Sequence, residues 1–232
     1  MFNNSNNKIF LLVGLKKYMI AIVDSKNDII LKEEISTNEI NKTEFVNLIS
    51  FLDTKVFKIE KKFNQFIKNI YLIIDHTNIH SINFSIKNKT DDILLNSETV
   101  NNLLIEAMNC CEQTLKNLDI LHMKVDQFCV DDYIYEVLPD KEKCKNFSID
   151  LSFICISNKI TKNLRKILSK YQISVKKTLS YIYLKKHKEF KNKNIFEIAS
   201  NVLNGMNEND VIFINRISKN QGFFEKFFNF FK

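Results

Sequence analysis

The 232-residue sequence contains only three glycines, one proline and no tryptophan. Gly14, Gly205 and Gly222 lie far apart, whereas dinucleotide-binding and P-loop motifs need clustered glycines, so that backbone N–H groups can approach phosphates. Both motifs are therefore excluded. No stretch approaches the ~20 apolar residues of a membrane-spanning helix, and the polar start from Met1 to Lys8 lacks the apolar run of a signal peptide. We expect a chain that is neither secreted nor membrane-spanning.

The cysteines and the charge narrow the environment further. The five cysteines include no CxxC pair, so neither a zinc site nor a disulfide framework is expected, and a reduced cytoplasm fits best. The formal net charge of +7 suits an anionic partner, either a membrane surface or a nucleic acid. The length allows one domain or two small ones.

Hydrophobic periodicity predicts an α+β fold in the order βββα and then ββαββα. Two strands are expected between residues 8 and 23, and the apolar spacing of residues 44–67 predicts an amphipathic helix. Further strands are expected at 29–35, 70–74, 81–86, 120–130, 147–156, 173–175 and 210–214, and further helices at 97–118, 161–171 and 195–203.

The last eleven residues, GFFEKFFNFFK, form an amphipathic pattern. At ~100° per residue, the six phenylalanines fall within one arc of roughly 160° on a helical wheel. Such a helix suits the membrane interface, although the same pattern fits a terminal helix that docks onto the protein's own core. The membrane interpretation is favoured, and the expected membrane-binding residues are Phe223, Phe224, Lys226, Phe227, Phe228, Phe230, Phe231 and Lys232.

Three segments in the middle of the chain share their order and spacing with one known family. They are IYLIID at 70–75, ILHMKVDQFCVDD at 120–132 and SIDLSFICIS at 148–157. Together they resemble the inserted 1C subdomain of the bacterial cell-division protein FtsA, of the actin-like family. Residues 8–67 resemble the start of the actin-like 1A subdomain, and residues 222–232 are similar to the family's membrane-targeting helix.

The resemblance implies four parts along the chain. A truncated actin-like 1A subdomain would occupy residues 1–67, and an FtsA-type 1C subdomain with the order strand-helix-strand-strand would occupy 68–185. Residues 186–221 would form a basic linker with a possible remnant of the second lobe, which is otherwise missing. Residues 222–232 would form the amphipathic helix that targets the membrane.

The resemblance also implies a function without chemistry. The first phosphate loop of an actin-like ATPase would fall at 12–15, where Val13 replaces the expected acid, and no glycine follows before Gly205. We therefore expect no ATP or other cofactor, no metal and no enzymatic activity. The implied role is a divisome adaptor at the cytoplasmic face of the inner membrane, at the division site. Its partners would be the membrane surface, division proteins such as FtsZ or later members, and further copies of itself.

Two other functions remain open. One is an actin-like membrane assembly factor for a pilus or secretion machinery. The other is a basic nucleic-acid-binding protein that uses the lysines of residues 185–193. No helix-turn-helix or RNA-binding aromatic motif accompanies those lysines, so a solvated linker is the preferred interpretation and nucleic acid is not an expected partner.

Other chemistry-bearing residues are interpreted as structural. His76 and His80 have metal-ligand spacing but lie between two expected strands, where that spacing does not set a common face. His122 is expected to be a partly buried histidine with its hydrogen bonds satisfied, and not a catalytic base. The carboxylates at 131–132 follow a strand and are expected to be solvated, and the cysteines at 110–111 lack a histidine partner for nucleophilic catalysis.

Overall fold

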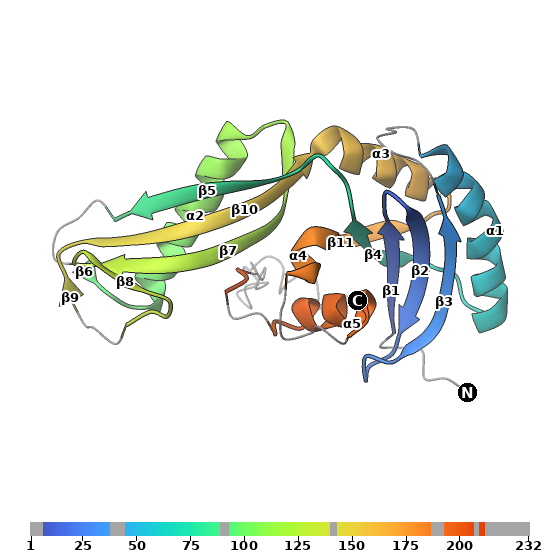
Figure 1. Ribbon diagram of the computed structural model, residues 1–232, viewed down its shortest axis with the longest axis horizontal. Helices are drawn as coiled ribbons and strands as arrows, with labels where there is room; N and C mark the ends of the chain where they lie inside the picture. The colour runs from blue at the N-terminus through green and yellow to red at the C-terminus, as the bar shows by residue number, and fades with distance from the viewer. Residues whose placement is uncertain are drawn as a thin grey trace, which may run out of the picture.

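The computed structural model describes residues 7–37, 45–88, 93–139, 143–186, 193–206 and 209–211. These residues form an α+β fold of two lobes, each built on its own sheet (Figure 1). The α+β class expected from the sequence is confirmed.

The first lobe is a five-stranded sheet with the strand order β11-β4-β1-β2-β3. Strands β1, β2 and β3 form an antiparallel meander, whereas β4 and β11 run parallel to β1. The bounds are β1 Lys8–Val13, β2 Lys17–Val23, β3 Ile29–Ser36, β4 Asn69–Ile74 and β11 Ser174–Ser180.

Helices cover both faces of this sheet, which explains why β1 and β2 are almost continuously apolar. On one face, α1 (Val46–Phe63) and α3 (Asn158–Ser169) pack against alternate residues of the central strands. On the other face, α4 (Tyr181–Lys185) and α5 (Ile195–Leu203) bury the remaining side chains. A strand between two helical layers has no polar face, so the usual alternation is lost.

Gly14 lies in the tight connection between β1 and β2. Its backbone N–H donates to the carbonyl oxygen of Lys17 across 3.0 Å. A Cβ atom at position 14 would lie 3.0 Å from that same oxygen and 3.0 Å from a methyl group of Leu12. A side chain at position 14 would therefore be tight against the turn, which would have to shift by a few tenths of an ångström to accept it.

The second lobe projects from the first as a four-stranded antiparallel sheet in the order β5-β10-β7-β8 (Figure 1). Its core follows the expected order of strand, helix, strand and strand, with β6, β8 and β9 as short additions. The bounds are β5 Ile79–Lys87, β6 Ile93–Leu94, α2 Ser97–Thr114, β7 Leu118–Val130, β8 Tyr133–Tyr135, β9 Lys143–Cys144 and β10 Phe147–Ser157.

Among the described residues, a helix covers only one face of the second sheet. Along β10, buried apolar residues alternate with half-buried, mostly polar ones, and the apolar set packs with α2 in one cluster. On the open face, the carboxylate of Asp150 accepts hydrogen bonds from Ser85 and Gln127, both at 2.6 Å. These cross-strand hydrogen bonds connect polar side chains of neighbouring strands, and this pattern is typical of a sheet face in contact with solvent.

The two lobes do not follow the domain boundaries expected from the sequence, which fall between residues 67 and 68 and between residues 185 and 186. Strands β4 and β11, which that division assigns to the second subdomain, hydrogen-bond within the first sheet. Strand β11 also continues to Ser180, beyond the expected end at 175, because its polar residues Lys176 and Lys177 hide the apolar period. The short helix α4 was not expected, and it includes Lys185, which the sequence places in a linker.

Helix α5 matches its predicted range and is anchored to the first sheet. Phe196 is fully buried and its ring lies 6.0 Å from that of Phe10. Lys8 Nζ donates to Ser200 Oγ at 2.9 Å, and the side-chain amide of Asn27 donates to that of Asn201 at 2.9 Å. Both apolar packing and polar contacts therefore attach α5 to the first sheet.

We predict that Phe196→Ala lowers the free energy of unfolding by about 3–5 kcal/mol, because it leaves a cavity in a closed core. The matched control is Phe57→Ala, since Phe57 is 70% exposed on α1 and its loss should change stability by no more than about 0.5 kcal/mol. Urea unfolding followed by circular dichroism measures both. Equal effects of the two substitutions would contradict the described docking of α5.

Candidate functional site

A cavity of about 490 Å³ opens where the two lobes meet. Helix α2 and the start of β7 line it from the second lobe, and α3 and β11 line it from the first. We call it the interlobe pocket. Its lining residues are Met108, Glu112, Leu115, Lys116, Leu118, Asp119, Ile120, Leu121, Thr161, Arg165, Lys177 and Thr178.

Two buried threonines in this pocket differ in their partners. The Thr161 hydroxyl hydrogen-bonds to the carboxylate of Asp119, which connects α3 to β7. The hydroxyl of Thr178, in contrast, has no hydrogen-bond partner among the described residues, although this side chain is 92% buried. The Thr178 hydroxyl oxygen is itself covered by protein atoms, and an unpaired buried hydroxyl costs stability.

Charged side chains of both signs surround the interlobe pocket. Lys116, Arg165 and Lys177 contribute cations, and Glu112 and Asp119 contribute carboxylates. Leucines and isoleucines of β7 form an apolar part of the lining. The interlobe pocket therefore combines hydrogen-bonding, charged and apolar groups, as ligand pockets commonly do.

On the other side of β7 from the interlobe pocket, the buried residue His122 connects the two lobes. The N–H of Ser180, at the end of β11, donates to His122 Nε2 at 3.0 Å, and the His122 ring stacks on Tyr183 of α4 with 3.9 Å between centroids. Because Nε2 accepts, the proton of the neutral ring is on Nδ1, which lies 3.7 Å from Asp210 Oδ2. His122 is hydrogen-bonded as expected, but it is fully buried instead of partly buried.

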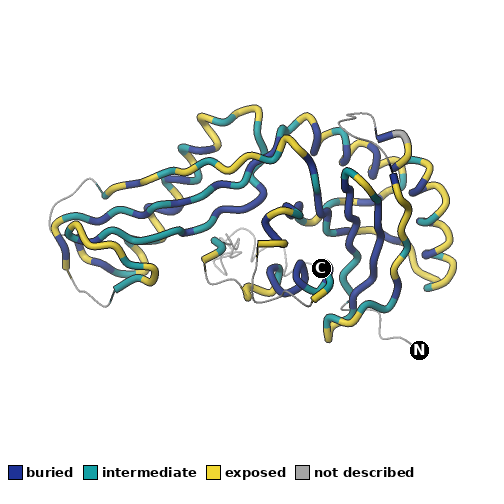
Figure 2. Tube along the Cα trace, in the orientation of Figure 1, coloured by how far each residue is buried: buried dark blue, intermediate teal, exposed yellow. Residues whose placement is uncertain are grey.

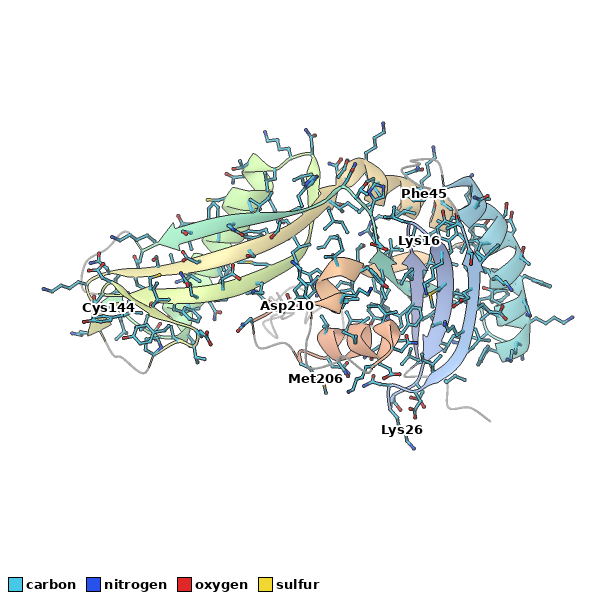
Figure 3. The ribbon with its side chains drawn as sticks, in the orientation of Figure 1. Lys16, Lys26, Phe45, Cys144, Met206 and Asp210 are labelled. Atoms are coloured by element: carbon cyan, nitrogen blue, oxygen red, sulfur yellow. The ribbon has the colours of Figure 1, made fainter. Side chains whose placement is uncertain are left out.

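The segment around Asp210 returns to the second lobe and extends its sheet. Asn209 accepts from the N–H of Val125, and Val211 donates to the carbonyl oxygen of Met123, both at 2.8 Å. Figure 3 shows Asp210 between the lobes, beside α4. The expected strand at 210–214 is thus seen as one bridge at Asp210, and its later residues lie outside the described part of the chain.

The remaining residues singled out in the sequence have structural roles. Cys110 and Cys111 are free thiols, and desolvation by burial raises the pKa of Cys111, which makes its thiolate form harder to reach. Burial also lowers the pKa of His76, and His80 is exposed. Asp131, in a turn, accepts from two backbone N–H groups of residues 145 and 146. Within the described ranges, no cluster of three metal-ligating side chains is present.

The expected membrane-binding residues from Phe223 to Lys232 lie outside the described residues, and so do 187–192 of the basic stretch. Their roles stay predictions. Among the described helices, none is long and apolar enough to cross a membrane.

No family model matches this chain, and no curated protein matches it. Among solved structures, it is similar to a chain of the PilM–PilN type IV pilus biogenesis complex, with 5% identity over 76% of this chain and 48% of that one, at a TM-score of 0.47. It is also similar to the cytoplasmic domain of EpsL, an inner-membrane component of the type II secretion system of Vibrio cholerae. That match has 10% identity, covers 77% of this chain and 59% of that one, and has a TM-score of 0.39.

A third similar structure is a Bacteroides thetaiotaomicron protein with an actin-like ATPase fold and unknown function. It is 11% identical over 79% of this chain and 56% of that one, with a TM-score of 0.35. The chain thus spans about half the length of the solved chains that it matches. Because all three TM-scores lie below 0.5, these likenesses carry no argument about function.

We predict opposite effects for two isosteric substitutions in the interlobe pocket. Thr178→Val removes an unpaired buried hydroxyl and should raise the free energy of unfolding by about 1 kcal/mol. Thr161→Val removes a hydrogen bond to a carboxylate and should lower it by about 1.5–3 kcal/mol. Thermal and urea unfolding of the purified chain measure both, and a loss of stability in Thr178→Val would contradict the described pocket.

Proposed function

We propose that this chain is an actin-like assembly protein of the bacterial cell envelope. Residues 222–232 attach it to the cytoplasmic face of the inner membrane, and the interlobe pocket holds a peptide segment of a partner protein. The protein acts by recruitment, and we propose no catalytic step.

The observation that carries this proposal is the interlobe pocket. Its volume of about 490 Å³ falls in the range of ligand sites. The charges of both signs at its lining suit a segment with acidic and basic side chains.

Attachment to the membrane adds to weak binding in the pocket. A short amphipathic helix binds lipid weakly and reversibly, and a single peptide segment in one pocket is also a modest interaction. When several copies join one assembly at a membrane, the effective concentration of each partner rises and the weak contacts reinforce one another.

The assembly itself can be a pilus or secretion machinery or the division apparatus. No described residue of this chain points in particular to division, or to a pilus or secretion machinery. The FtsA-like role inferred from the sequence therefore remains one of two proposals. Cellular localisation separates them.

We expect a fluorescent fusion of the full chain to localise at the cell envelope and to become diffuse with Phe227→Asp and Phe228→Asp together, because two carboxylates on the apolar arc oppose insertion. Phe57→Asp is the matched control, since this exposed phenylalanine lies on α1, and it should leave the pattern unchanged. Polar or scattered envelope foci would indicate a pilus or secretion assembly, and a midcell band would indicate division. A diffuse wild-type signal, or one over the nucleoid, would contradict the proposal.

A further inference from the structure

Three of the four edge strands in the two larger sheets are protected against further pairing. Strand β3 carries charges, among them Glu33, whose carboxylate pairs with Lys55 and Lys58 of α1 at 2.6 and 3.1 Å. Strand β11 carries two adjacent lysines and a register shift after Val175. Strand β8 has only three residues. Charges, irregular register and short length are the usual means by which proteins avoid edge-to-edge association.

Strand β5 forms the fourth edge and lacks each of these protections. Its nine residues, IHSINFSIK, contain no proline and only one lysine, which is the last residue of the strand. All nine pair with β10 without a register shift. In the part of the chain that the structure describes, no strand pairs with the outer edge of β5, and Figure 2 shows the strand exposed or half-buried along most of its length.

The direction of the backbone groups follows from one hydrogen bond. The N–H of Asn88, just after β5, donates to the carbonyl oxygen of Phe147 at 2.9 Å. Because alternate residues of an antiparallel strand turn their N–H and C=O groups to opposite sides, even-numbered residues of β5 face β10. The N–H and C=O groups of Ser81, Asn83 and Ser85 therefore point outward along the free edge.

The sequence of β5 is self-complementary about Asn83. In an antiparallel pair of two such strands centred there, Asn83 faces Asn83 and Ser81 faces Ser85 on the polar side. On the apolar side, Ile82 faces Phe84, an aromatic and β-branched pair of the kind that stabilises sheets. Lys87 faces Ile79, so no like charges meet. In this register, the outward N–H and C=O groups of odd-numbered residues in one copy of β5 lie opposite those of odd-numbered residues in the other, so the two strands can form backbone hydrogen bonds.

We propose that β5 is the interface for a second copy of this chain. The two copies pair antiparallel about a two-fold axis at Asn83, which joins their four-stranded sheets into one continuous eight-stranded sheet. Such an interface is isologous, because each copy contributes the same strand. It leaves the interlobe pocket of both copies outside the contact.

A charge exchange at position 83 tests the proposal on the full chain. Asn83 is exposed, so Asn83→Lys and Asn83→Glu place like charges opposite each other only in the dimer. Each variant alone should dissociate roughly fivefold more readily than the wild type at low salt. An equimolar mixture of the two should regain dimers. Sedimentation velocity measures the dimer, and thermal unfolding checks that each variant is folded.

Cysteine cross-linking tests the register independently. Under mild oxidation, Asn83→Cys should give a covalent dimer, because residue 83 faces its own copy across the axis. Lys87→Cys lies on the same face of β5 but far from the axis, so it should cross-link no more than the wild type does. A wild-type chain that stays monomeric, a mixture that fails to recover dimers, or equal cross-linking at positions 83 and 87 would each overturn the proposal.

Discussion

The parallel pairing of β4 with β11 is the interaction on which the rest of the structure depends. The register joins Asn69 to Ser174 and Ile74 to Ser180, and the chain between the two strands builds α2 and the four-stranded sheet of the second lobe before it returns through α3. Parallel strands need a long crossover, and here that crossover is a lobe with its own sheet and core. The strand before the second lobe and the strand after it are therefore hydrogen-bonded neighbours in the first sheet.

This pairing also places the candidate site. Strand β7 of the second lobe lies against β11 of the first, so one side of the joint forms the interlobe pocket, with Thr178 in its lining. The other side is sealed by His122, which accepts from the N–H of Ser180. Because His122 fills one side of the contact between the lobes and the interlobe pocket opens on the other, the proposed partner could enter the pocket without moving the two sheets. The same geometry leaves β5 at the far edge of the second sheet, away from the pocket.

The sequence predicts the elements whose hydrophobic pattern is decided locally. The continuous apolar runs of β1 and β2, and the helical spacing in α2 and α5, gave those elements with small errors at their ends. The length of β11 could not be predicted, because Lys176 and Lys177 interrupt its pattern where it forms a sheet edge. The pocket could not be predicted either. Whether the hydroxyl of Thr178 finds a partner depends on α2 and β7, which are distant in sequence, and no short motif signals it.

The claim that the interlobe pocket holds a segment of a partner protein is tested most directly by photo-crosslinking in cells. A benzophenone amino acid in place of Lys116, an exposed residue of the pocket lining, should give one predominant protein adduct, and Arg165→Glu in the same chain should reduce it. The same amino acid in place of Phe57, exposed on α1, should not give that adduct. No adduct at position 116, or the same adducts at both positions, would contradict the account.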